Sequence, residues 1–297
     1  MNQVLGDKRA ILILLGPALL MYSVIMVIPV VWSFGFALFR GNLIEGFTFV
    51  GLANFARLIQ DEQVGSAVRF TLLYTVVIST GQILLGYSLA LLYTFVLRRS
   101  SSLIRTLVFF PVVLPSVAVG LLFSRLFAVA PNTGPVESLL TLFGVAPFDF
   151  FAGAGTAFWV IVVMDLWRSM GFYGVLLFSG LVDIPGEILE AARIDGARGW
   201  RLIRSVVLPL SLPILVSSII FSLNASLKVF DTIVALTNGG PGSQTTPITL
   251  LMFQTSFFYS SFGYGSSMAI LISVMCLTVT AFIFKYSRRD LTVAEAA

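Results

Sequence analysis

Long apolar segments that carry no charged residue constrain this chain more than any other feature. No Asp, Glu, Lys or Arg occurs from Ile11 to Phe39 or from Phe70 to Leu97. A helix that crosses a lipid bilayer needs about 20 mostly apolar residues, and both segments exceed that length. Of the 297 residues, 58% are hydrophobic and only 11% are charged, whereas soluble chains carry about 25% charged residues. We therefore predict an all-α membrane protein.

Six segments are long and apolar enough to span the membrane. We place them at about Ile11–Phe39, Phe70–Leu97, Thr106–Phe127, Phe158–Gly180, Ser205–Asp231 and Gly265–Phe284. Proline is expected to disturb the first span near Pro29 and the start of the third near Pro111 and Pro115. The first span exceeds the apolar core of a signal peptide, about 7–15 residues, so we expect it to remain uncleaved. Two shorter apolar stretches, Leu139–Phe151 and Ile248–Phe258, are expected to form interfacial or re-entrant helices.

The distribution of Lys and Arg predicts the orientation of these spans. With six spans, one side of the membrane collects Lys8, Arg9, Arg98, Arg99, Arg105, Arg193, Arg198, Arg201, Arg204, Lys285, Arg288 and Arg289. The other side holds only Arg40, Arg57 and Arg69. Because basic residues concentrate in cytoplasmic loops, we expect both termini and the Arg193–Arg204 segment to lie in the cytoplasm.

Composition also limits the chemistry that the chain can perform. The sequence has no histidine, and its one cysteine, Cys276, lies in an apolar block. An internal disulfide and a metal site built from Cys and His are therefore excluded. No G-x-x-x-x-G-K-[ST] phosphate loop occurs, so we expect no ATP hydrolysis by this chain alone. We predict no catalytic residue, no metal ligand and no bound cofactor in it.

The connection between the fourth and fifth spans is longer and more patterned than a plain connector. Pro185 suits the first turn of a helix, and the acidic residues Glu187 and Glu190 are favourable near a helix N-terminus. Ile188, Ala191 and Ala192 are spaced i, i+3, i+4, which predicts a small apolar face. Such a face suits a groove on a partner protein, and it equally suits a helix that rests on the membrane surface.

A bend and a second helix are expected after this segment. Gly196 fits a helix stop. Trp200, Ile203 and Val207 then form the predicted apolar stripe of a helix that leads into the fifth span.

Within this connection, Glu190-Ala-Ala-Arg-Ile-Asp-Gly-Ala197, followed by Leu208-Pro209, resembles the EAA signature of permease subunits of bacterial ATP-binding-cassette importers. Val50-Gly-Leu-Ala-Asn-Phe55 and Thr237-Asn-Gly-Gly-Pro241 are similar to the carbohydrate-uptake branch of that family. The chain departs from the branch at Phe70-Thr71, where members often carry Asn-Thr.

The resemblance implies a fold, a set of partners and a location. It implies the type I importer permease fold, with one transmembrane domain over residues 1–297 and a cytoplasmic coupling segment at about 183–204. The ATPase-docking positions carried over from the motif are Glu190, Ala191, Ala192, Asp195 and Gly196. ATP and Mg²⁺ would be bound by a cytoplasmic ATPase dimer rather than by this chain. A second permease subunit, usually making a heterodimer, and an extracytoplasmic solute-binding protein would complete a transporter in the bacterial inner membrane.

Polar residues within the spans are the candidates for the solute path. Asp165 and Arg168 lie at i, i+3 in the fourth span, where a charged side chain costs at least about 2.5–3.5 kcal/mol. They form either a mutually neutralised structural pair or part of the path, in which their charge-assisted hydrogen bonds would suit sugar hydroxyls. Ser169 follows directly.

The fifth span adds Ser222 and Ser226, which share a face at i, i+4 and either contact solute or bond their own helix. Near its outer end we expect Lys228 and Asp231 to form a local ion pair. Gln82, in the second span, is a further candidate, as is Tyr87.

These observations predict the permease subunit of an ATP-driven importer for a disaccharide, oligosaccharide or related polyol. An ion-coupled secondary transporter is the alternative, but Asp165 is the sole acid near mid-depth and no inverted repeat is visible. A membrane anchor without transport activity would not need the EAA-like segment.

Overall fold

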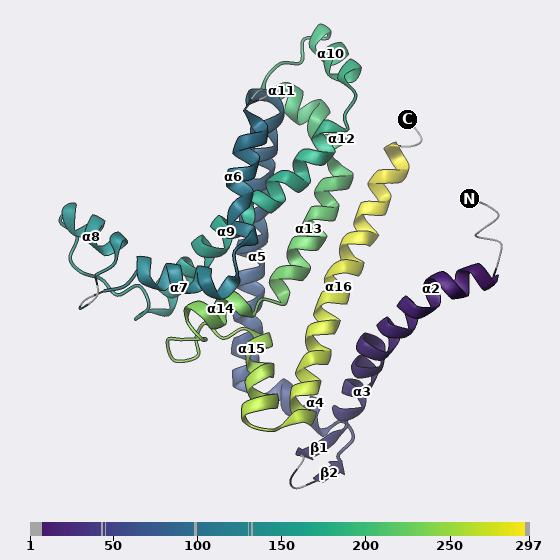
Figure 1. The fold of residues 1–297 in the computed structure, drawn as a ribbon, viewed down its shortest axis with the longest axis vertical. Coiled ribbons are helices and arrows are strands. Elements are labelled where there is room, and N and C mark those ends of the chain that lie inside the picture. The colour runs from purple at the N-terminus through teal and green to yellow at the C-terminus, as the bar shows by residue number, and fades with distance from the viewer. Residues whose placement is uncertain are drawn as a thin grey trace. The chain divides into compact units, whose positions relative to one another are not determined.

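The computed structural model (Figure 1) describes residues 8–42, 44, 46–97, 100–129, 131 and 133–294, with side chains given from 12 to 285 within these ranges. Arg98 and Arg99 lie outside the described residues, and so do the side chains of Lys8, Arg9, Arg288 and Arg289. The chain divides into two compact units, Met1–Val64 with Leu251–Leu271, and Gly65–Leu250 with Ile272–Ala297. The orientation in the membrane and the assignment of one domain to residues 1–297 stay predictions.

Six membrane segments were predicted, and the structure agrees by length and composition. Four helical stretches qualify as spans, Leu12–Phe36, Glu62–Val96, Ala154–Val182 and Phe262–Lys285, and two bent helix pairs bring the total to six among the described residues. The second span begins at Glu62, eight positions before the predicted start, because the amphipathic turns at its N-terminus are also helical.

The first unit contains the first span and a hairpin that the sequence analysis missed. α2 (Lys8–Tyr22), η1 (Ser23–Val27) and α3 (Ile28–Phe36) make up the span. Phe39 was predicted to end it, but it begins β1 (Phe39–Asn42), which pairs antiparallel with β2 (Gly46–Phe49). α4 (Ala53–Gln60) follows, and the Nδ2 of Asn54 donates to the carbonyls of Ala37 and Phe39, both at 2.8 Å.

Two prolines follow widened helical turns. The π-helical turns η1 and η3 (Ile203–Val207) each end two residues before a proline, Pro29 and Pro209. A proline ring collides with the carbonyl four residues earlier in an α-helix, and a π turn changes the position of that carbonyl. The disturbance predicted near Pro29 therefore takes the form of a local change in helix type.

The second unit is a helical bundle. Its elements are α5 (Glu62–Leu91), η2 (Leu92–Val96), α6 (Ser101–Val113), α7 (Ser116–Leu126), α8 (Pro135–Leu142), α9 (Ala154–Val182), α10 (Gly186–Ile194), α11 (Trp200–Leu202), η3, α12 (Leu208–Leu210), α13 (Leu212–Leu227) and α14 (Asp231–Leu236). α9 packs against α6, α7, α13 and α14. Ile78, Ile161 and Ile233, from α5, α9 and α14, are fully buried together. α9 is therefore the central helix of this unit.

The third and fifth spans are broken. A kink had been predicted in the third span near Pro111 and Pro115, whereas the fifth span had been predicted to be continuous. α6 and α7 meet at 94° around Leu114 and Pro115, because a residue that precedes proline is pushed out of the helical region, and Leu114 is extended. The Trp200–Leu210 and Leu212–Leu227 stretches meet at 72°. Pro111, the other predicted kink, lies inside α6.

The two short apolar stretches have different outcomes. Ile248–Phe258 is a short helix, formed by α15 (Ile248–Phe253) and η4 (Gln254–Phe258), as predicted. A helix over Leu139–Phe151 was wrong, because α8 ends at Leu142. Gly144, at φ +76, adopts the left-handed conformation that terminates helices, and its N–H bonds the carbonyl of Thr141 at 2.9 Å. The last helix, α16 (Phe262–Ala294), begins in the first unit and ends in the second.

Candidate functional site

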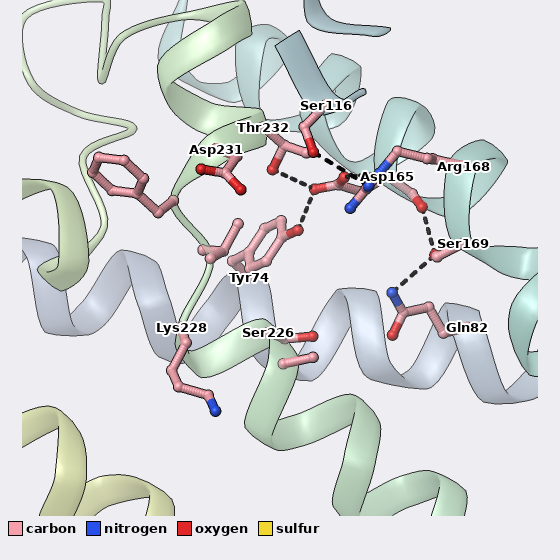
Figure 2. A pocket seen from close by; sticks show the side chains of 13 residues that line it. Tyr74, Gln82, Ser116, Asp165, Arg168, Ser169, Ser226, Lys228, Asp231 and Thr232 are labelled. Atoms are coloured by element: carbon pink, nitrogen blue, oxygen red, sulfur yellow. Dashed lines mark hydrogen bonds and ion pairs between the residues drawn. The ribbon is translucent and has the colours of Figure 1, made fainter. Parts of the chain in front are cut away.

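A polar pocket lies inside the second unit, between α5, α7, α9 and the connection from α13 to α14 (Figure 2). Its volume is about 200 Å³, and it is lined by Tyr74, Gln82, Ser116, Asp165, Arg168, Ser169, Ala225, Ser226, Lys228, Val229, Phe230, Asp231 and Thr232. The pocket thus gathers four charged side chains, two acidic and two basic, within a membrane-spanning bundle.

Asp165 is held by two neutral hydroxyl donors. Tyr74 from α5 and Thr232 from α14 both donate to its Oδ2, the latter at 3.0 Å. Asp165 itself is only 4% exposed. Because both hydroxyls bind Oδ2, the other oxygen, Oδ1, accepts no hydrogen bond from them and can interact with a further polar group.

Arg168 lies beside this carboxylate but does not complete a hydrogen bond to it. Its Nε is 3.7 Å from Asp165 Oδ1, which is an ion pair beyond the usual hydrogen-bond distance. One terminal nitrogen donates to Ser116 Oγ at 3.3 Å. The buried Nε has no hydrogen-bond acceptor among the described residues. An unpaired buried donor costs about 1–3 kcal/mol, so this group favours an incoming acceptor.

An unfilled donor, Arg168 Nε, thus lies beside the carboxylate oxygen Asp165 Oδ1. A hydroxyl group can accept a hydrogen bond from Arg168 Nε and donate one to Asp165 Oδ1, whereas a carboxylate or phosphate can only accept. A solute rich in hydroxyl groups therefore matches both partners. The charges that line the pocket also balance, because Asp165 and Asp231 offset Arg168 and Lys228.

A chain of hydrogen bonds joins three helices next to this pair. Ser169 Oγ donates to the carbonyl of Asp165 at 2.5 Å and accepts from Gln82 Nε2 at 2.9 Å. Gln82 Oε1 in turn accepts from Ser222 Oγ at 2.6 Å. Ser226 lines the pocket and lies 3.4 Å from Ser79. α9, α5 and α13 are therefore fixed to one another by side chains rather than by packing alone.

The structure thus brings together four of the five candidate path residues. Asp165, Arg168, Ser169 and Ser226 line the pocket, while the fully buried Ser222 lies behind Gln82. Whether these residues contact solute stays a prediction.

The expected ion pair between Lys228 and Asp231 was wrong. Arg168 and Asp165 form the one ion pair found in the described part of the chain, and Figure 2 shows the Lys228 and Asp231 side chains pointing in different directions. α13 ends at Leu227 and α14 begins at Asp231. An i, i+3 pair meets only when both residues lie on one helix, and here the chain turns between them.

Three polar pocket residues escaped the sequence analysis: Tyr74, Ser116 and Thr232. Tyr74 had a detectable signal. Polar residues recur along α5 every three or four positions, at Thr71, Tyr74, Thr75, Ser79 and Gln82, which is the spacing of a polar helix face. Ser116 and Thr232 had none, because the break at Pro115 and the turn after Leu227 bring them into place.

The coupling segment predicted at about 183–204 forms the short helix α10 at one end of the second unit (Figure 1). Gly196, at φ +86, ends it as expected. The Gly196 N–H bonds the Arg193 carbonyl at 3.1 Å, and the Ala197 N–H bonds the Ala192 carbonyl at 2.8 Å. This pair of bonds is the Schellman motif, which fixes the end of the helix.

Most of the predicted docking positions are exposed. Glu190, Ala191, Asp195 and Gly196 are solvent-accessible, but Ala192 is half-buried and packs with Leu189 and Ala197 against the bundle. The predicted face of Ile188, Ala191 and Ala192 was therefore wrong as a single surface, because Ala192 turns inward.

The stripe predicted after the bend was wrong at Trp200, which is 72% exposed. Leu202 and Val207 are the buried residues here. The π turn η3 shifts the angular phase of this helix, so the 3.6-residue spacing does not apply.

Comparison with known proteins identifies the family to which the chain belongs. Residues 82–293 match the family described as binding-protein-dependent transport system inner membrane component. The chain is 32% identical to the trehalose/maltose transport system permease protein MalF of Thermococcus litoralis, covering 92% of this chain and 91% of that protein. It is 30% identical to the diacetylchitobiose uptake system permease protein NgcF of Streptomyces coelicolor, covering 92% and 81%.

The fold is also shared with a solved structure. A chain of a bacterial ABC transporter that imports the acidic polysaccharide alginate superposes with a TM-score of 0.82, at 21% identity, over 92% of this chain and 93% of that one. The pocket residues from Gln82 onward and the whole coupling segment fall within the matched family region.

Proposed function

Since the chain belongs to the inner-membrane components of binding-protein-dependent transport systems, we propose that it is the permease subunit of an ATP-driven importer for a disaccharide, oligosaccharide or related polyol. Relatives named for trehalose/maltose and diacetylchitobiose support a saccharide. The observation that carries the substrate class is the pocket in which Asp165 Oδ1 and Arg168 Nε are 3.7 Å apart. That gap suits a hydroxyl group, which both donates and accepts.

The energy for import comes from a separate ATPase subunit that binds ATP and Mg²⁺. The chain has no phosphate loop of its own, and its relatives are transport permeases. The docking surface for the ATPase consists of Glu190, Ala191, Asp195 and Gly196, with Ala192 supporting them from beneath. Glu190 and Asp195 have no ion-pair partner within the described ranges, so both carboxylates are free to pair with basic residues of a partner.

An extracytoplasmic binding protein delivers the solute, and a second permease subunit completes the path, as a heterodimer. One structure with the same fold contains a periplasmic protein bound to an alginate pentasaccharide, which supports the first partner. The loop around Asn238–Gly242 is the proposed contact for the binding protein. Its backbone is left-handed at Asn238, Gly239, Gly242 and Ser243, and the hydroxyl of Thr245 bonds the Gly240 carbonyl at 2.5 Å, so it is a shaped turn.

Affinity purification of the tagged chain in mild detergent, followed by mass spectrometry, tests the partners. We expect an ATP-binding subunit, a second permease and a saccharide-binding protein to co-purify. Proteoliposomes that contain this assembly should accumulate maltose, trehalose or diacetylchitobiose only when ATP is supplied on the side of the ATPase. Uptake that needs no ATP and follows a proton or sodium gradient would contradict the proposal and favour the secondary transporter, which no comparison supports.

A further inference from the structure

A second opening in the second unit lies between α6 and α9, away from the pocket around Asp165. It has a volume of about 310 Å³ and is lined by Ser102, Arg105, Thr106, Phe109 and Val175. The four α6 residues are spaced i, i+3, i+4 and i+7, so they share one helix face. The opening therefore presents polar groups at the start of α6 and apolar groups one turn further along.

Close packing of the two helices fixes the position of this opening. A Cβ atom added to Gly171 would lie within 3 Å of the backbone of Val108 and Phe109, so glycine lets α6 and α9 touch at that level. Val175 lies one helical turn beyond Gly171 on α9. The opening is thus the space immediately beside a rigid contact, and its shape does not depend on a loop.

Arg105 brings a positive charge to the opening that no carboxylate in the described part of the chain neutralises. Its guanidinium carbon lies 4.1 Å from the centre of the Phe178 ring, and its Nε donates to the Ser101 carbonyl at 3.1 Å. These two contacts hold the side chain in place. The hydroxyl groups of Ser102 and Thr106 flank it.

These groups lie at one end of a membrane segment and border an apolar surface. α6 starts at Ser101 and is the first half of the bent third span. Leu103, Leu107 and Phe110 of the same helix are 66%, 63% and 61% exposed, as expected for contact with lipid tails. Basic pockets between membrane helices near the bilayer surface bind anionic lipid headgroups.

We propose that this opening binds an anionic phospholipid, with the lipid phosphate on Arg105 and Ser102 and the start of an acyl chain against Phe109 and Val175. Charge complementarity argues for this occupant, because a half-buried, unpaired cation beside exposed apolar side chains matches both ends of such a lipid. The opening shares no lining residue with the solute pocket or the coupling segment, and its lipid would stabilise the α6–α9 contact from the membrane side.

Native mass spectrometry of the purified transporter, with its co-purified subunits, tests the proposal. Phosphatidylglycerol is titrated into three delipidated proteins, the wild type, Arg105→Gln and Arg69→Gln. Arg69→Gln is the control, because it also removes one positive charge, but at an exposed position of α5 outside the opening. We expect Arg105→Gln to weaken the tightest phosphatidylglycerol site by about fivefold, the effect of one basic residue near a membrane surface. Arg69→Gln should leave that site unchanged, and Arg105→Lys should keep most of the affinity.

Three results would overturn the proposal. One is an equal loss of phosphatidylglycerol affinity in Arg105→Gln and Arg69→Gln. Another is that the tightest site of the wild type retains phosphatidylcholine as well as it retains phosphatidylglycerol. The third is displacement of the lipid by inorganic phosphate, which would indicate a site for a free anion. If Arg105→Gln does not fold, Val175→Phe is used in its place. Its larger ring fills the apolar end of the opening, while the charge of Arg105 stays in place. The same loss of phosphatidylglycerol is then expected.

Discussion

The hydroxyl of Tyr74 on α5 donates a hydrogen bond to Asp165 Oδ2 on α9, inside the membrane-spanning bundle. Tyr74→Phe removes this donor and leaves Thr232 alone to hold the carboxylate. Because a buried polar group that loses a partner costs about 1–3 kcal/mol, we expect a lower thermal midpoint of the detergent-solubilised protein and weaker solute uptake. Tyr87→Phe is the matched control, since its hydroxyl meets Ser211 away from the pocket. Equal effects of both variants on uptake would contradict a specific role for Tyr74.

A comparison of single and double variants separates the two interpretations of the charged pair. Loss of a hydrogen bond to a charged group costs about 1.5–3 kcal/mol, which is about 10- to 100-fold in affinity. If Asp165 and Arg168 contact solute, Asp165→Asn, Arg168→Gln and the double variant should all raise the KM for uptake by about that factor. If the pair is only structural, the double variant should recover much of the uptake, because it leaves no unpaired charge. The KM values of the three variants, measured in proteoliposomes, decide between these results.

The exposed carboxylate of Glu190 gives a test of the coupling segment. Glu190→Lys reverses one charge on the surface of α10 without touching the half-buried Ala192 and Leu189 that hold the helix. We expect solute-stimulated ATP hydrolysis to fall at least tenfold, while membrane insertion and the amount of folded permease stay the same. Glu62→Lys, at an exposed position at the start of α5, is the control for charge reversal as such. Unaltered stimulated hydrolysis in Glu190→Lys would show that this position is not part of the docking surface.

The acid side of the stability profile should depend on Asp61, just before the second span. Burial by itself raises the pKa of this carboxyl. Hydrogen bonds from Tyr264 and from the backbone of Gln63 and Val64, together with the charge of Arg57, lower the pKa by more than burial raises it. The net pKa therefore lies below the ordinary value of an Asp carboxyl. A group with a depressed folded-state pKa stabilises the protein above its unfolded pKa and loses this contribution as the pH falls through the folded pKa. Asp61→Asn should therefore lower the thermal midpoint at pH 7. The difference should begin to shrink below about pH 4 and disappear only once the pH has fallen below the folded-state pKa. A difference that stays constant from pH 7 to pH 3 would assign the effect to lost hydrogen bonds alone.

Much of the fold follows from the sequence because lipid imposes a simple rule. A long, mostly apolar segment must be a helix that crosses the bilayer, so the second, fourth and sixth spans were placed correctly to within a few turns. A disturbance near Pro115 was predicted, but not that it would break the helix, and the break at Ser211 was not predicted. A proline in a membrane helix can be absorbed by a π turn, as at Pro29, or can break the helix, as at Pro115. Which of these happens depends on how neighbouring helices satisfy the freed backbone groups.

The candidate site was predicted in part for a similar reason. Asp165 and Arg168 could be identified because charge in a span is costly wherever the helix lies. Thr232 could not, since it reaches the carboxylate only because the chain turns after Leu227 and starts a new helix at Asp231. The same turn separates Lys228 from Asp231. Spacing along the sequence thus predicted contacts within one helix and failed where two elements meet.

Gly171 offers a test of how closely α6 and α9 must approach. A Cβ atom at this position would fall on the backbone of Val108 and Phe109, which cannot move aside as a flexible side chain could. Overpacking of this kind typically costs about 1–3 kcal/mol, so Gly171→Ala should lower the thermal midpoint and reduce uptake by shifting Arg168 and Asp165 relative to Ser116. Gly155→Ala on the same helix has no atom within 4 Å of the new methyl group and should be neutral or slightly stabilising. If both alanine variants unfold at the wild-type temperature, the two helices are free to separate, and the pocket does not depend on their contact.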